Sequence, residues 1–220
     1  MLISEPTKNG TGIAVYGNYD ELDFFYSIVH RIADTLSEVN EQQRGQNMLL
    51  MNFAYEIRKA KDHSRLIEKV DIDGEEMTIY GFQVVWTDLM IFLSVLRYNA
   101  GYISLDKLEQ SFLYMLEFIT EDAARRYDAK AAENLKPILI SGVYVGHKYV
   151  FQIYQTIHTE FISANKGKRR FRNIPDYLWN YLSPLAHGHL DLIDSLEFSA
   201  KKHNCTVFDL EIGDLSEIEW

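Results

Sequence analysis

The chain has 220 residues, of which 47% are hydrophobic and 13% aromatic, and its net charge is −10. This charge excludes nucleic-acid binding over the whole surface, and the single cysteine, Cys205, excludes an internal disulfide. No apolar run approaches the roughly 18 residues that span a bilayer, and the first residues form no apolar signal segment. We therefore expect a soluble cytoplasmic protein that does not contact a membrane and folds as one domain over residues 1–220.

The N-terminal part of the chain predicts one strand followed by two helices. Residues 11–16 form the strand, with Ile13 and Val15 on one face. Asn18 and, three residues later, Glu21 fit a capping box, which starts the first helix. Its apolar stripe recurs at the helical period, at Leu22, Phe25, Val29, Ile32 and Leu36. A polar loop at residues 40–45 then leads to a second helix, whose buried stripe is Leu49, Leu50, Phe53, Ile57 and Ala60.

Residues 65–85 carry the clearest strand signal. Apolar and polar residues alternate on both sides of Asp73-Gly74, a dipeptide typical of the type I′ turn of a hairpin. The alternating apolar positions are Leu66, Val70 and Ile72 before the turn, and Met77 and Ile79 after it. Gly81 shifts the phase of the second strand, which is typical of a bulge.

Residues 86–101, WTDLMIFLSVLRYNAG, predict the helix around which the fold is organised. A helix that is apolar on nearly every side belongs in the interior. Thr87 suits its N-cap, and Gly101 suits a left-handed C-terminal residue. The short connection that follows predicts antiparallel packing against the stripe of the next helix, formed by Leu108, Phe112, Leu116 and Ile119.

The rest of the chain predicts mainly helices. Their expected ranges are 105–127 with Ser104 as cap, 129–135 ending before Pro137, 148–164, a short helix from Pro175 to Leu182, and 188–203. Residues 138–146 suit either a strand or a buried helical turn, and residues 165–173 suit a basic loop. Alternation at Phe208, Leu210 and Ile212 predicts a final strand. Together these elements predict a helix-rich α+β single domain with a small, mostly antiparallel sheet around the buried central helix.

Three segments together resemble a known family. They are GIAVYGNYDELDFFYSIVHRI near the start, LRYNAG at the end of the central helix, and KRRFRNIPDYLW further on. The chain resembles a bacterial family catalogued only as a domain of unknown function. The resemblance implies a cytoplasmic bacterial protein with no assigned activity, and it carries no catalytic residue over to this chain.

A cluster near the C-terminal end suits metal binding. It consists of His187, His189, Asp191 and Asp194. Such groups could hold a divalent ion with a third ligand from elsewhere, such as His30 or His147. The cluster resembles the start of the metallo-β-lactamase motif, but Leu192 breaks the Asp-His pair with which that motif continues. The alternative is an exposed helix start, where the helix dipole favours Asp191.

A second candidate site is a dense basic segment around one aromatic residue. It comprises Lys166, Lys168, Arg169, Arg170, Phe171 and Arg172. The cations could grip phosphates and the ring could stack on a base, as in nucleic-acid binding. The alternative is a solvated loop, or one paired with the acidic tail at Asp209, Glu211, Asp214, Glu217 and Glu219.

The sequence lacks the motifs of known catalytic sites. A nucleophile elbow, the zincin pattern and a phosphate-binding loop are all absent. The 14 tyrosines and three tryptophans are of the kind enriched at interfaces. We therefore expect a non-enzymatic protein without a cofactor that acts by protein–protein contact or self-association. The alternatives are a metal-dependent hydrolase at His187, His189 and Asp191, and nucleic-acid binding through residues 166–172.

Overall fold

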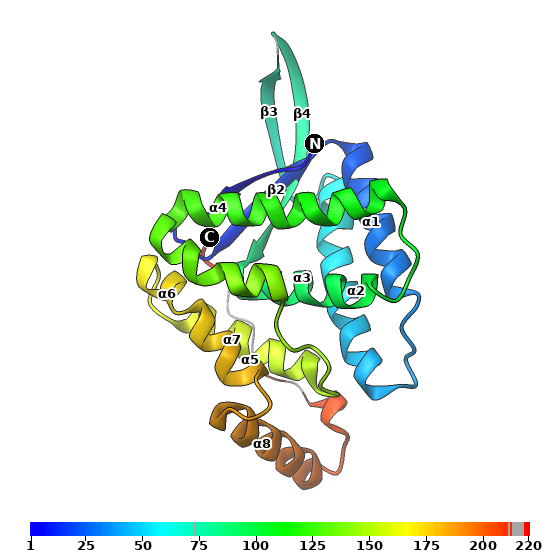
Figure 1. Ribbon diagram of the computed structural model, residues 1–220, viewed down its shortest axis with the longest axis vertical. Helices are drawn as coiled ribbons and strands as arrows, with labels where there is room; N and C mark the ends of the chain where they lie inside the picture. The colour runs from blue at the N-terminus through cyan, green and yellow to red at the C-terminus, as the bar shows by residue number, and fades with distance from the viewer. Residues whose placement is uncertain (73, 211, 213–217) are drawn as a thin grey trace.

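The computed structural model describes residues 1–72, 74–210, 212 and 218–220. Within these residues the chain forms eight α-helices and one four-stranded antiparallel sheet, which confirms the predicted helix-rich α+β fold. The hairpin of β3 and β4 projects from the body, and α4 crosses in front of β2 (Figure 1). No helix in the described part of the chain combines the length and the apolarity that crossing a membrane requires.

The sheet has the order β1-β2-β4-β3, with β1 Ile3–Pro6, β2 Gly12–Gly17, β3 Leu66–Ile72 and β4 Glu75–Val85. The predicted hairpin is confirmed, because Ile72 pairs with Glu75 across a two-residue turn. Gly74 in that turn has a φ of 86°, which favours glycine, while Asp73 lies outside the described residues. The short edge strand β1 was not predicted from the sequence.

The predicted bulge at Gly81 is wrong. The β-ladder runs without interruption through Gly81, which lies opposite Tyr16 on one side and Leu66 on the other. A Cβ atom at position 81 would lie only 2.4 Å from Cδ1 of Tyr16. Glycine is therefore required here because the tyrosine ring covers its backbone, which is another common reason for glycine inside a strand.

The first two helices follow the predicted pattern closely. α1 Tyr19–Ala33 begins with the predicted capping box, in which Asn18 Oδ1 accepts from the Glu21 amide at 2.9 Å. α2 Glu41–Lys61 begins earlier than predicted, because Asn40 caps it and the segment expected to be a loop is helical. Both apolar stripes are buried in the core.

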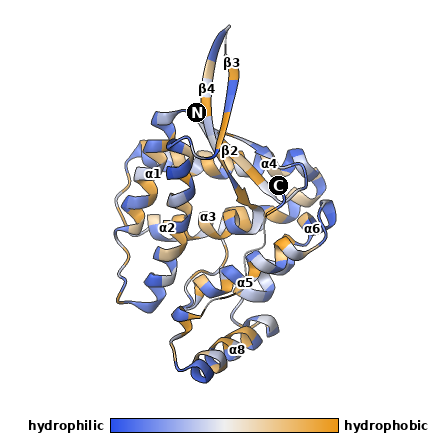
Figure 2. Cartoon of the chain, turned by 180° about the vertical axis from the view of Figure 1, so that it is seen from behind, coloured by the Kyte–Doolittle hydropathy of each residue, from blue (hydrophilic) through white to orange (hydrophobic). Residues whose placement is uncertain are grey.

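The central helix is α3 Trp86–Ala100, and its burial is confirmed. Trp86 is fully buried, and Phe92 stacks on Phe53 of α2 with ring centroids 4.8 Å apart. Figure 2 shows that α3 is apolar over most of its length. The predicted caps are wrong: Val85 occupies the N-cap without a side-chain bond, and Gly101 is right-handed at φ −68°.

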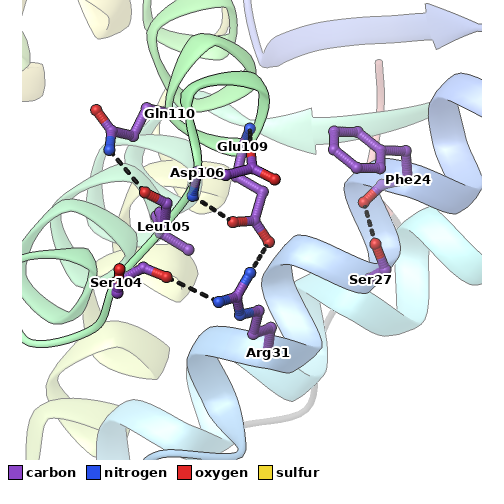
Figure 3. A network of polar contacts seen from close by, with 8 residues as sticks. All are labelled: Phe24, Ser27, Arg31, Ser104, Leu105, Asp106, Glu109 and Gln110. Carbon is purple, nitrogen blue, oxygen red and sulfur yellow. Dashed lines mark hydrogen bonds and ion pairs between the residues drawn. The ribbon is translucent and has the colours of Figure 1, made fainter.

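α4 Lys107–Ser141 joins the two helices predicted at residues 105–135. The non-helical backbone of Asp128, with φ −152°, separates its two halves, and the second half continues through Pro137. Its cap is Asp106 instead of Ser104. Arg31 of α1 donates to Glu109 in the first turn of α4 and to the carbonyl of Ser104 at 2.7 Å. These bonds connect α1 to the start of α4 (Figure 3).

α3 packs against α4 as predicted, and Arg97 donates from Nε to Glu117 at 2.8 Å between them. Three members of the predicted stripe are buried, namely Phe112, Leu116 and Ile119. The fourth, Leu108, is exposed because it lies on the outer side of the first turn.

The remaining helices are α5 Val150–Ser163, α6 Lys168–Arg172, α7 Ile174–Leu182 and α8 His187–His203, followed by the 3-10 helix η1 Val207–Asp209. Residues 138–141 are helical and residues 142–146 are irregular, which answers the ambiguity at 138–146. The predicted basic loop contains α6. The predicted final strand is wrong for Phe208, which lies in η1 and packs on Tyr149 with ring centroids 5.9 Å apart. Leu210 and Ile212 are in no strand, and residues 211 and 213–217 lie outside the described part.

Candidate functional site

A cleft of about 560 Å³ opens between α2, the end of β4, α3 and α5. It exists because β4 is longer than β3. The pairing with β3 ends where Leu66 meets Gly81, so residues 82–85 have a neighbouring strand only on the β2 side. Gln83, Val84 and Val85 line the cleft at this open edge. A cleft of this volume is within the range of small-molecule sites.

A buried acid–base pair lies at the cleft. Asp88, in the first turn of α3, and His158, on α5, each have side chains that are only 7% exposed. Nδ1 of His158 lies 2.6 Å from Oδ2 of Asp88. Tyr154, one helical turn before His158, donates its hydroxyl to the same oxygen at 3.4 Å, and Thr87 donates to Oδ1 at 3.3 Å. Helical spacing therefore aims two side chains of α5 at one carboxylate of α3.

The surroundings of the pair change its proton affinities. Burial alone would lower the pKa of His158, but the charge of Asp88 and the hydrogen bond to it raise this pKa above its ordinary value. Burial, together with the nearby charge of Asp88, raises the pKa of Tyr154 well above its ordinary value. Tyr154 therefore stays a proton donor, and His158 holds its proton more tightly than a free imidazole does.

The geometry leaves one imidazole nitrogen available. Because Nδ1 faces Asp88, the proton of the neutral ring resides on Nδ1, and Nε2 carries the lone pair. Among the described residues, Nε2 of His158 has no hydrogen-bond partner. It can therefore accept a proton or hydrogen bond when the ring is neutral, and donate one when the ring is charged.

Other elements complete the walls of the cleft. Arg65 bonds Glu56 of α2 through Nε at 2.8 Å and Nη2 at 3.0 Å. Ile218 and Trp220 form another wall. That segment is held in place because Asn9 donates to the carbonyl of Trp220 at 2.7 Å, and Thr11 Oγ1 donates to the carbonyl of residue 219 at 2.6 Å.

The predicted metal cluster is only partly brought together. His187 and Asp191 are exposed on the first turns of α8, whereas His189 is buried and its Nδ1 lies 2.7 Å from the carbonyl oxygen of Tyr181. Of the two suggested third ligands, His147 does lie beside His189, with ring centroids 5.0 Å apart. Within the described residues, however, no three His, Cys, Asp or Glu side chains are placed to hold a metal ion.

The residues of the basic segment point in different directions. Arg170 and Phe171 are buried, and Phe171 packs between Trp86 and Tyr127 with ring centroids about 5 Å from each. Its ring is therefore not free to stack on a base. Arg172 bonds Asp128 at 2.8 Å, and Lys166 pairs with Glu219 of the tail, as the alternative to nucleic-acid binding expected. Lys168 and Arg169 remain exposed.

Sequence reasoning missed the Asp88–His158 cleft. Asp88 falls within the expected central helix, residues 86–101, and His158 within the expected helix 148–164, and neither was singled out as a site residue. The available signal was that each is a titratable residue on a segment otherwise expected to be buried. Such residues are seldom fully buried without a partner, but the sequence does not say which partner each has.

Comparison with known proteins gives a family but no activity. No curated protein matches the chain, and no solved structure matches it. One family model does match, over residues 2–220, which is nearly the whole chain. The chain therefore belongs to the family described as a domain of unknown function (DUF6904), as the resemblance of its three segments implied.

Proposed function

We propose that the protein acts by binding, and that the Asp88–His158 cleft takes up a small polar ligand. The observation that carries this proposal is the buried acid–base pair in a cleft large enough for a small molecule. Desolvating two ionisable groups costs free energy that apolar residues of the same volume would not. Groups with perturbed pKa values in a cleft are for this reason functional-site candidates.

The test is a ligand screen by thermal shift, run on the wild type, on two variants of the cleft and on one control variant. Asn52 is exposed on α2 at the rim, so Asn52→Trp fills the entrance without touching the core. His158→Gln removes the free imidazole nitrogen. A ligand of the cleft stabilises the wild type and loses its effect in both variants, while His203→Gln on the exposed end of α8 leaves the effect unchanged. A ligand that stabilises all four proteins equally would place its site elsewhere.

A second candidate function is self-association, which a cluster of exposed tyrosines favours. Tyr98 and Tyr102 are 48% and 74% exposed, and their ring centroids are 5.4 Å apart. A hydrogen bond to Tyr102 raises the pKa of Tyr98, and nearby Tyr144, also exposed, adds to the effect. Exposed aromatic clusters are typical of interfaces.

Solution mass tests this second candidate. If the tyrosine cluster joins two copies, the wild type is dimeric at high concentration, and replacing Tyr98 and Tyr102 with Ser yields monomers. Replacing exposed Tyr114 of α4 with Ser serves as the matched control and leaves the dimer intact. A wild type that stays monomeric at millimolar concentration rules out self-association.

A further inference from the structure

The charged atoms that line the cleft are unequally available. Asp88 already accepts hydrogen bonds on both oxygens, from Thr87, Tyr154 and His158. Glu56 likewise accepts on both oxygens, from Arg65. The carboxylates are therefore occupied within the wall, whereas Nε2 of His158 has no partner among the described residues. A charged imidazole ring thus offers an N–H group to whatever occupies the cleft.

The walls of the cleft are aromatic as well as polar. Tyr154 and Trp220 line it and are both partly exposed, and Phe92 also lines it, with its ring centroid 5.6 Å from that of Tyr154. The amide side chains of Asn52, Gln83 and Gln155 add neutral hydrogen-bonding groups. A planar apolar ring with one acceptor group at its end matches this arrangement of side chains.

We infer that the cleft binds small aromatic carboxylates, with the carboxylate on Nε2 of His158 and the ring between Tyr154 and Trp220. This inference rests on the proposed function of the same cleft. A hydrogen bond between a charged imidazole and a carboxylate is charge-assisted and stronger than one between neutral groups. An aromatic amine would instead need the carboxylate of Asp88 as its acceptor, and would have to displace the three donors that already bond to it.

With the His158 ring protonated, the charges of the cleft offset one another, because Asp88 offsets His158 and Arg65 offsets Glu56, so no net negative charge opposes an acidic ligand. α3 contributes Asp88, and α5 itself contributes Tyr154. α2 contributes Glu56, which is neutralised by Arg65. α7, also packed on α5, contributes Tyr177 and Tyr181, and Tyr181 bonds Glu160. Asp88 raises the pKa of His158 despite its burial, so the ring keeps its proton at higher pH than a free imidazole does. The affinity for a carboxylate should therefore fall as the pH rises through the pKa of His158.

The experiment compares three small probes that share a phenyl ring and differ in charge: benzoate, benzamide and benzylamine. Each is titrated into the full chain by calorimetry, and the imidazole nitrogens of His158 are followed by NMR. We expect benzoate to bind about tenfold more tightly than benzylamine, and about tenfold more weakly to His158→Gln, since a hydrogen bond to a charged group is lost. His203→Gln, the matched control, should bind benzoate as the wild type does.

Three results would overturn the inference: benzylamine binding as well as benzoate, no binding of benzoate at millimolar concentration, or no shift of the Nε2 resonance of His158 on binding. The NMR measurement uses the wild type, so it decides even if the His158 variant does not fold. If benzoate fails but another ligand is lost in Asn52→Trp, the cleft still binds ligands and only the ligand class is wrong. If the screen also yields no such ligand, the proposed function fails with it.

Discussion

Nδ1 of His158 lies 2.6 Å from Oδ2 of Asp88, and this contact joins α5 to the central helix α3 across 70 positions of the chain. Both side chains are almost completely buried. The contact therefore contributes to the fold as well as to the cleft, and its two contributions can be measured separately.

Replacing Asp88 with Ala should lower the free energy of unfolding by about 3–5 kcal/mol, because the variant leaves His158 buried without its counter-charge. Urea denaturation at pH 6 measures the loss. The matched control is Asp194→Ala on the exposed side of α8, which should change stability by less than about 0.5 kcal/mol. Similar losses in both variants would mean that the pair contributes nothing specific.

The same pair also predicts a dependence on pH. The pKa of His158 is raised in the folded protein, so the folded protein binds this proton more tightly than the unfolded chain does. The resulting stabilisation is complete below the unfolded pKa of 6.5 and is lost as the pH rises through the folded pKa. Unfolding curves from pH 6 to 9 should show this decline in the wild type but not in His158→Gln.

His147 predicts the opposite dependence. Burial, with the neighbouring His189 and Lys148, lowers the pKa of His147 from 6.5 to about 4. The unfolded chain therefore takes up a proton that the folded protein rejects, and stability should fall as the pH drops from 6.5 towards 4. Because this ring is only half-buried, we expect an effect of about 1 kcal/mol or less.

Unfolding measured between pH 4 and 7 tests the role of His147. The decline towards acid should be shallower in His147→Gln than in the wild type, and unchanged in His187→Gln, whose side chain is exposed. An equally steep decline in His147→Gln would contradict the prediction.

The core around α3 predicts a large effect of truncation. Phe92 is 4% exposed and stacks on Phe53, so Phe92→Ala should cost about 3–5 kcal/mol, the range for an aromatic residue removed from a core. Phe198→Ala on α8 is the control, because its ring is 69% exposed. A loss below about 1 kcal/mol for Phe92→Ala would show that α3 is not the centre of the packing.

Two neighbouring arginines of α6 should contribute very different amounts to the stability of the fold. Arg170 is buried, donates to Thr11 Oγ1 at 2.7 Å and lies over the ring of Phe161, 4.8 Å from its centroid. Arg170→Met leaves the hydroxyl of Thr11 and nearby carbonyls without this donor, which should cost about 1–3 kcal/mol. Arg169→Met, at an exposed position, should have almost no effect on denaturation. Equal effects would mean that the burial of Arg170 does not matter for folding.

Local signals in the sequence were sufficient to predict several elements. The capping box at Asn18, the stripes of α1 and α2, and the hairpin between β3 and β4 were predicted correctly, since caps, helical period and turn residues depend on neighbours in the chain. The burial of α3 was predicted because a helix that is apolar on all sides is stable only in the interior of the protein. The predictions failed at Gly81 and at Phe208, where a contact from a distant segment decides the conformation. They also failed at the expected caps Thr87, Gly101 and Ser104, so a local signal did not always suffice.

The candidate site likewise depends on contacts between segments that are distant in the chain. By itself the sequence placed Asp88 on the buried helix at 86–101 and His158 on the helix at 148–164, but only the packing of α5 on α3 brings the two within hydrogen-bond distance. Packing also turned Arg170 and Phe171 inward while leaving Arg169 outside, although all three are consecutive residues of the basic segment. A sequence pattern records what each residue prefers, whereas a buried polar residue is stable only if the tertiary structure supplies its partner.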